Sequence, residues 1–434
     1  MTSPAKRLIA AAAALAALLL SSVPAGAPEV HLSITKGFGE KVIIAVPLFH
    51  GSSGSTSTKD MRVVLSADLR NSGYFSVVEN LSFVDEVETD DRRAGRVDFA
   101  EWLTLGAEVL VKGDIAVRGQ EMTLEAQAYD LSVGRSIFSR RYVGAPGRWR
   151  TMVHELADDL VRQLTGEQGI ARSKIAFVSN ATGTKEIYVM DYDGENMRRL
   201  TKDGLAAMYP AWFADNGTVA YTRFRKNGQE LVALTVGTGV IRRLTAFPGL
   251  NAFAAVSSKG NEIAMTLSRD GNPEIYRLRA DGTDPRRLTR GSATESSPCW
   301  SPDGRRIAFV SDRSGTPQVY VMSAAGGAEE RMTYRGSYNS APAWSPKGDL
   351  IAYTARVDGV FQVCTLDVET KDVVQLTTGA GNKEDPSWAP DGRHLVYSVR
   401  SQRKSDLYML DIYDLVPVRL TSGSGDHVSP AWSH

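Results

Sequence analysis

Residues 297–304 read Ser-Pro-Cys-Trp-Ser-Pro-Asp-Gly, and residues 307–311 read Ile-Ala-Phe-Val-Ser. Both stretches return every 44 residues in the second part of the chain. The tryptophan recurs at four further positions of the series, with Val256 at the remaining one: Trp212, Trp344, Trp388 and Trp432. A Leu-Thr pair keeps the same period, with Met332 replacing leucine once: Leu200, Leu244, Leu288, Leu376 and Leu420. Several anchors that share one period identify a repeat architecture.

The repeated unit consists of short strands. Residues 307–311 and 318–322 are rich in branched and aromatic side chains, and a turn containing Gly and Pro separates them. A third strand carries the Leu-Thr pair, and a fourth runs into Pro-x-Trp. Four antiparallel strands in roughly 40–45 residues are typical of a propeller blade. We therefore predict an all-β six-bladed β-propeller over residues 166–434.

The two ends of the repeat region are complementary. The first copy begins at the strand that contains Ile175, with no Pro-x-Trp strand before it, and the last copy stops just after Trp432. We expect the C-terminal strand to complete the first blade and close the ring, because closure removes exposed sheet edges.

Residues 28–165 are predicted to form an α/β domain. Strand patterns occupy 41–49, 74–78 and 108–117, and a hairpin spans 122–129 and 136–143. Helical spacing follows the flexible loop 51–58 as far as Gly73, and it returns at 99–105 and 148–164. Since the link 167–173 is short, we expect the two domains to pack against each other.

The first 27 residues have the pattern of a secretory signal peptide: Lys6 and Arg7, an apolar run over 8–20, and Ala-Gly-Ala at 25–27. The apolar run is short for a membrane span, and no later stretch is long enough. Removing this leader leaves 48 basic against 50 acidic residues, which gives no basic field for nucleic acid. Cys299 and Cys364 are predicted to lie in different blades and to remain unpaired.

Residues 28–37 alternate apolar and polar side chains, so this segment can pair as an edge strand with its own domain or with a partner. Its candidate partner-binding residues are Glu29, Val30, His31, Leu32 and Ile34.

No catalytic constellation is present. The six histidines show no H-E-x-x-H or Cys-His zinc spacing, and neither Gly-x-Ser-x-Gly nor a P-loop occurs. His154 is interpreted as a surface or packing residue of a helix. The repeated Asp-Gly pairs are interpreted as hairpin turns rather than calcium ligands, and the tryptophans as packing between blades rather than ligand-stacking rings.

The loops before the Pro-x-Trp strands vary most among the repeats. In a propeller such loops surround the mouth of the central channel, where a rigid frame presents variable side chains. Any single one of these residues could instead be a solvated loop tip. The candidate partner-binding residues at this mouth are Tyr209, Asn251, Glu295, Ser297, Asn339, Ser340, Glu384, Asp385 and His427.

Several motifs resemble the TolB family of the bacterial Tol–Pal system. They are the Trp-Ser-Pro-Asp-Gly repeats, Asp-Leu-Arg-Asn-Ser-Gly-Tyr-Phe at 68–75, and the stretches 164–166, 172–178, 191–196 and 430–433. The resemblance covers the whole mature chain in order. The chain departs from the family pattern at 249–254, where Asn251 remains but the neighbouring histidine and proline are absent.

The resemblance implies a periplasmic, non-enzymatic and monomeric adaptor. In that family the channel mouth binds the peptidoglycan-associated lipoprotein Pal, the mature N-terminal segment communicates with TolA, and the system supports outer-membrane integrity and constriction at division. Further Tol and outer-membrane partners are implied as well. No cofactor is predicted, although the family associates calcium with acidic residues of the channel. The alternative is an exported propeller that binds a small molecule or glycan, or that serves as the recognition domain of a hydrolase.

Overall fold

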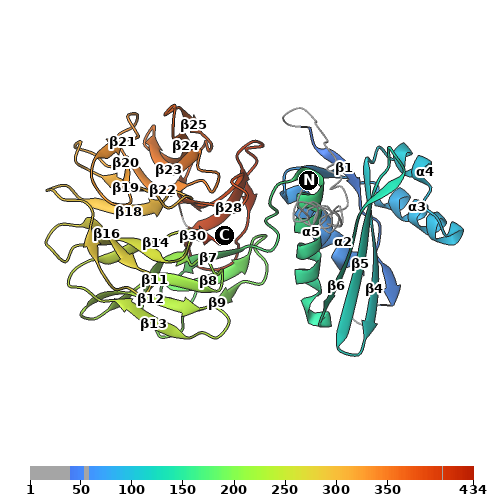
Figure 1. Cartoon of the computed structure of the whole chain (residues 1–434), viewed down its shortest axis with the longest axis horizontal. Helices are drawn as coiled ribbons and strands as arrows, with labels where there is room; N and C mark the ends of the chain where they lie inside the picture. Colours follow the sequence, from blue (N-terminus) through green and yellow to red (C-terminus); the bar gives the residue numbers. More distant parts are fainter. Residues whose placement is uncertain (1–39, 53–57, 403) are drawn as a thin grey trace, which may run out of the picture.

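The computed structural model describes residues 40–52, 58–402 and 404–434, which form an α/β part and a propeller (Figure 1). The predicted leader 1–27 and the predicted partner-binding segment 28–37 lie outside the described residues. In the part that is described, no helix is long and apolar enough to span a bilayer.

The α/β part is built on one sheet with the strand order β3-β1-β4-β5-β6, and β2 pairs with β4. Pairing is parallel from β3 to β4 and antiparallel from β4 to β6. The strands are β1 Val42–Ala45, β2 His50–Ser52, β3 Phe75–Val77, β4 Val109–Arg118, β5 Glu121–Asp130 and β6 Arg135–Gly144. The helices are α2 Thr58–Asn71, α3 Leu81–Ala94, α4 Phe99–Thr104 and α5 Trp149–Thr165, with a short 3-10 turn η1 at Pro146–Arg148.

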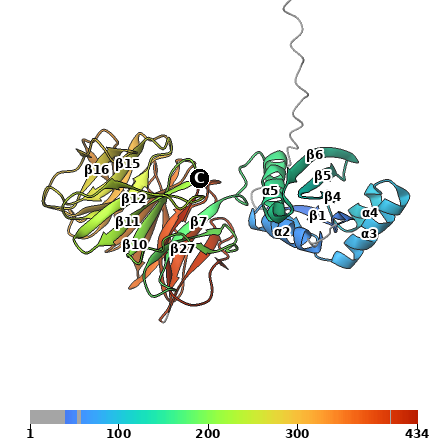
Figure 2. The same cartoon turned by 90° about the horizontal axis from the view of Figure 1, so that it is seen from below.

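Helices α2 and α5 lie between the sheet and the propeller, whereas α3 and α4 lie on the far side (Figures 1 and 2). The apolar stripe of α5 is fully buried at Val153, Leu156 and Leu160, as its helical spacing predicts. Two elements correct the sequence prediction. The sequence pattern predicted no element at 81–94, where α3 forms, and β2 extends into the flexible loop expected at 51–58.

The propeller consists of six four-stranded antiparallel sheets, which confirms the predicted fold class. From the channel outward, three blades are β10 Ala207–Trp212, β11 Thr218–Arg225, β12 Gly228–Thr235, β13 Ile241–Thr245; β14 Asn251–Val256, β15 Glu262–Leu267, β16 Glu274–Arg279, β17 Arg286–Arg287; and β18 Glu295–Trp300, β19 Arg306–Ser311, β20 Gln318–Ser323, β21 Glu329–Arg331. The other three are β22 Asn339–Trp344, β23 Leu350–Val357, β24 Val360–Asp367, β25 Val373–Gln375; β26 Asn382–Trp388, β27 His394–Arg400, β28 Ser405–Asp411, β29 Val418–Arg419; and β30 His427–Trp432, β7 Lys174–Ser179, β8 Glu186–Asp191, β9 Arg198–Arg199.

The last blade in this series joins the two ends of the repeat region. The C-terminal strand β30 pairs antiparallel with β7, with Trp432 opposite Ile175 and His427 opposite Ser179. Each inner strand also contacts the inner strands of both neighbouring blades, so the ring is continuous. The predicted closure by the C-terminal strand is confirmed.

The recurring tryptophans and threonines hold the blades together. The indole N–H groups of Trp212, Trp300 and Trp388 each donate to a backbone carbonyl on the inner strand of the preceding blade, at 2.9, 3.0 and 3.0 Å. In five of the six blades the threonine at this position accepts a backbone N–H from the third strand of its own blade, as in the 2.9 Å bond from Val363 to Thr377. Both anchors therefore recur for structural reasons. Cys299 and Cys364 are free and lie in neighbouring blades.

The motif at 68–75 forms the interface between the two parts. Asp68 accepts a hydrogen bond from the hydroxyl of Tyr192 in the propeller, at 2.7 Å, and its other oxygen lies 2.7 Å from Nδ1 of His154. The guanidinium of Arg393 donates to the carbonyl of Gly73 at 3.1 Å and lies 4.6 Å from the centre of the Tyr74 ring. His154 is thus a buried packing residue, and the two parts are joined by specific contacts as well as by the short link.

Candidate functional site

A cavity of about 170 Å³ lies on the propeller axis, where the six inner strands meet. Two successive positions of the 44-residue repeat line it. The first position supplies Tyr209, Phe253, Ser297, Ala341, Asp385 and Ser429, and the second supplies Pro210, Ala254, Pro298, Pro342, Pro386 and Pro430. Every blade therefore contributes one variable side chain and one small or cyclic residue to the same hollow.

A strained backbone conformation aims these variable side chains. All six residues at the first position have a left-handed φ, from +47° at Ala341 to +58° at Tyr209. Each lies within a shift of strand register, such as the one between Met208 and Ala211 in β10. A β-bulge of this kind re-aims a side chain, and positive φ at a residue other than glycine costs energy. Strain that is repeated in every blade favours a functional role for this ring.

The ring is chemically uneven. Tyr209 and Phe253, on adjacent blades, have ring centroids 4.2 Å apart at 41°. The blade of Asp385 lies across the channel from the blade of Phe253, given the order of the sheets. The hydroxyl of Ser429 donates to Asp385 at 3.1 Å. One side of the cavity is thus aromatic and the opposite side is acidic.

Burial controls the ionisation of the acidic side. It raises the pKa of Asp385, although the hydrogen bond from Ser429 opposes this shift. Burial also raises the pKa of Glu384, and the charge of Asp385 raises it further. The pKa of Tyr209 is raised by burial and then by the nearby charge of Asp385. Aromatic and acidic groups of the cavity are therefore electrostatically coupled.

Substituting Asp385 with asparagine tests this account through stability. Because the folded chain holds this proton more tightly, protonated Asp385 contributes stability that is fully present below its ordinary pKa of 3.8 and is lost as the pH rises through the raised pKa. We expect Asp385→Asn to raise the melting temperature at neutral pH and to leave it unchanged near pH 3.5. Thermal melts of both proteins across this pH range provide the measurement, and a less stable variant at neutral pH would contradict the account.

The structure separates the predicted channel residues into groups. Tyr209, Ser297 and Asp385 line the cavity. Ser340 and Glu384 are partly buried, one residue before the lining position. Four others share one earlier repeat position and are almost completely buried in the blades: Asn251, Glu295, Asn339 and His427. Partner binding by all of these residues remains a prediction.

The four residues at the buried repeat position support the wall of the cavity. Glu295 accepts hydrogen bonds from Arg313 at 2.7 Å and from Ser311 at 3.0 Å, and burial raises its pKa despite these bonds. His427 packs edge-on against Phe177, with ring centroids 5.5 Å apart, and burial lowers its pKa. Such side chains fix the inner strands.

Of the six variable lining residues, the predicted contact set omitted three, namely Phe253, Ala341 and Ser429, and it also omitted the six residues at the second lining position. The 44-residue period was the signal that could have found the first three, because they align with Tyr209, Ser297 and Asp385. The N-terminal candidates Glu29, Val30, His31, Leu32 and Ile34 lie outside the described residues.

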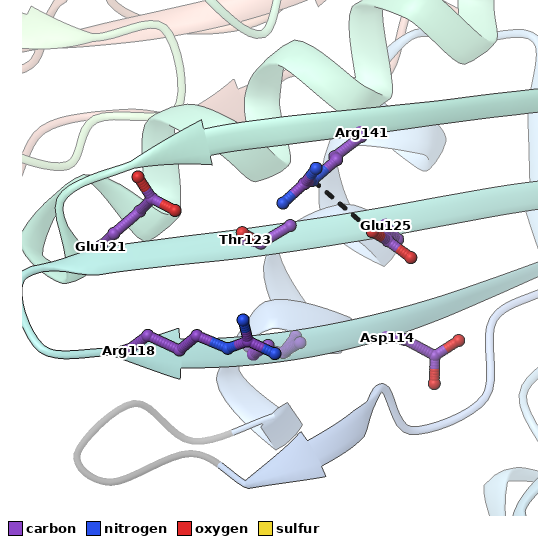
Figure 3. Close-up of a pocket in the computed structure, with 8 residues that line it drawn as sticks. Asp114, Arg118, Glu121, Thr123, Glu125 and Arg141 are labelled. Carbon is purple, nitrogen blue, oxygen red and sulfur yellow. Dashed lines mark ion pairs between the residues drawn. The ribbon is translucent and has the colours of Figure 1, made fainter.

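A second hollow lies on the open face of the α/β sheet, over β4, β5 and β6 (Figure 3). Glu125 and Arg141 point toward each other across neighbouring strands, with 3.5 Å between their charged atoms. Both side chains are more than 60% exposed, and exposed ion pairs contribute little energy. Its exposed side chains of mixed charge make this hollow a weaker candidate than the channel.

One group of side chains in the described part of the chain has the spacing of metal ligands: Asp68, His154 and Asp193. It lies at the domain interface, and each member already has a partner, since Asp68 binds His154 and Asp193 pairs with Arg150. Glu384 and Asp385 belong to no such group among the described residues. Calcium binding at the channel therefore stays a prediction.

Comparison with known proteins identifies the family of the chain. Residues 161–434 match the model of the TolB beta propeller domain, and residues 30–137 match the model of the TolB amino-terminal domain. The chain belongs to the TolB family. A crystal structure of TolB from Acinetobacter baumannii superposes with a TM-score of 0.80 at 26% identity, covering 91% of this chain and 97% of that one.

Several curated relatives carry the name Tol-Pal system protein TolB, including the following two. The Desulfosudis oleivorans protein is 35% identical over 205 residues, covering 46% of this chain and 47% of that protein. The Geobacter sulfurreducens protein is 36% identical over 208 residues, covering 47% of each. The matched segments thus span about half the length of these TolB relatives.

Proposed function

We propose that this TolB-family chain is a non-enzymatic periplasmic adaptor of the Tol–Pal system. Its channel mouth binds Pal, and its segment 28–37 binds TolA, so that the complex supports outer-membrane integrity and constriction during division. The proposed function needs no cofactor.

The observation that carries this proposal is the ring of six left-handed residues around the cavity. A rigid, closed frame that aims one variable side chain per blade into a shared hollow is suited to recognising a protruding part of another protein. Family membership and the Tol–Pal names of the relatives direct the choice of partner. The cavity of about 170 Å³ is smaller than the roughly 300–1,000 Å³ usual for small-molecule pockets, which disfavours a glycan or metabolite as ligand.

Coupling between the two partners follows from linkage. If Pal binds more tightly to one state of the N-terminal segment, then the population of that state must rise when Pal binds. TolA must in turn change the affinity for Pal by the same factor.

The experiment is calorimetric titration of the mature chain with the soluble domain of Pal from the same organism. Tyr209→Ala removes an aromatic anchor of the cavity, and we expect it to weaken binding by roughly 10- to 100-fold, as for a central interface residue. The matched control is Tyr338→Ala, because Tyr338 also belongs to an aromatic pair, with Phe361 at 5.4 Å, but does not line the cavity. Equal losses of affinity in both variants would show that Pal does not bind at the cavity. A wild-type chain that does not bind Pal would refute the proposal.

A further inference from the structure

We propose that the channel mouth receives one cationic side chain, a lysine or arginine of the bound partner, between Asp385 and the Tyr209–Phe253 pair. This inference rests on the proposed function and specifies the chemistry that the partner must present.

Asp385 lacks a counter-charge within the described residues. Its carboxylate accepts one hydrogen bond from Ser429, and no ion pair there includes Asp385 or Glu384. The cation nearest in sequence, Lys383, is buried and donates to the carbonyls of Gly379 and Ala380, at 2.7 and 2.8 Å.

Three buried acidic side chains of the blades are each paired with an arginine. Glu274 pairs with Arg287 at 2.5 Å, and Asp406 pairs with Arg419 at 2.6 Å. Glu295, at an equivalent strand two blades away, pairs with Arg313 at 2.7 Å. Carboxylates withdrawn from water are normally paired or bound to a metal. Asp385 and Glu384 are partly buried and have no such partner in the described part of the chain, and Asp385 lines the cavity, which points to a cation supplied from outside the chain.

The opposite wall fits the rest of a long cationic side chain. The faces of Tyr209 and Phe253 and the neighbouring prolines offer apolar surface to a methylene stem. Aromatic faces also attract ammonium and guanidinium groups within about 6 Å. An acid opposite a pair of aromatic rings thus matches both ends of a lysine or arginine.

A divalent metal ion fits this cavity less well. Calcium requires about 6–8 oxygen ligands, and magnesium requires octahedral geometry. Asp385 and the Ser429 hydroxyl are the close polar pair of the ring, and no group of three ligand side chains occurs there among the described residues. An organic cation needs only one carboxylate and an apolar wall.

The first test compares Pal binding by the wild-type chain, Asp385→Asn and Asp349→Asn. Asparagine keeps the size of the side chain and the hydrogen bond from Ser429, so the variant is expected to fold. We expect Asp385→Asn to weaken binding by roughly 10- to 100-fold and to reduce its salt dependence. Asp349→Asn removes an exposed carboxylate of the β22–β23 turn, outside the cavity, and should change affinity by less than about threefold.

If Asp385→Asn binds Pal as tightly as the wild type, the cation inference is wrong while the adaptor function stands. If the wild type does not bind Pal, the adaptor function fails, and the chemistry of the cavity is then tested without Pal. In that second test the carboxyl carbon of Asp385 is followed by NMR while n-butylguanidinium, n-butanol or calcium chloride is added.

We expect n-butylguanidinium to lower the pH midpoint of Asp385 and to shift the ring signals of Tyr209 and Phe253, and we expect n-butanol to leave the midpoint unchanged. The ring shifts should be absent in Asp385→Asn. Equal ring shifts in that variant, or a response to calcium with none to n-butylguanidinium, would overturn the inference.

Discussion

A chain that ends at Asp426 is expected not to form a folded propeller at 25 °C. The truncation removes β30, which is the inner strand of its blade and pairs with β7 on the channel side. It also removes Trp432, which is 3% exposed and donates to the hydroxyl of Ser173 at 2.7 Å. Losing a buried tryptophan costs about 3–5 kcal/mol, and each strand hydrogen bond adds about 1 kcal/mol. The total is comparable with the roughly 5–15 kcal/mol that stabilises a whole domain.

Near-ultraviolet circular dichroism and thermal melting measure this loss, because the four blade tryptophans that remain after truncation report the packing of the ring. The control is removal of His434 alone. Its backbone exchanges two hydrogen bonds with the exposed side chain of Asn216, so we expect a change of less than about 1 kcal/mol. A truncated chain that melts at the wild-type temperature would refute the role given to β30.

Closure could be predicted because the repeat has one period and its two ends are complementary. Helix α3 could not, because its buried face is partly polar. Only Val84 and Val87 supply an apolar signal there, whereas Asp91 is buried and accepts a 2.8 Å hydrogen bond from the indole of Trp102. Lys112, on β4, forms ion pairs with Glu88 at 2.8 Å and Asp91 at 3.1 Å. Apolar periodicity does not reveal a helix that packs through its carboxylates.

The channel could be placed from the sequence, but the orientation of its residues could not. Asn339 is buried in the blade, whereas Ala341 lines the cavity. Simple alternation does not explain this difference, because residues two positions apart in a regular strand point to the same face. The bulge between Ser340 and Ala343 and the left-handed φ of Ala341 change the direction of the side chain. A bulge interrupts the two-residue period of a strand, so an analysis of that period does not predict where the bulge lies.

Replacing Asp68 with alanine is expected to produce the other large loss of stability, at the interface between the two parts. Asp68 is 2% exposed, and its two oxygens bind Tyr192 and His154, each at 2.7 Å. Burial raises the pKa of Asp68 and His154 opposes the shift, while burial and Asp68 raise the pKa of Tyr192 well above its ordinary value. Alanine leaves two buried polar groups without this partner, which costs about 3–5 kcal/mol.

Calorimetry and solution scattering distinguish a local loss from separation of the two parts. We expect Asp68→Ala to split one unfolding transition into two and to increase the radius of gyration, because Tyr192 is a contact across the interface. Tyr192→Phe removes only one hydroxyl and should cost about 1–1.5 kcal/mol. Adding Tyr192→Phe to Asp68→Ala should cost little more than Asp68→Ala alone, since the shared bond is already lost. Additive effects would show that the two side chains act independently, and an unchanged radius of gyration would show that Arg393 and the buried apolar contacts hold the two parts together without Asp68.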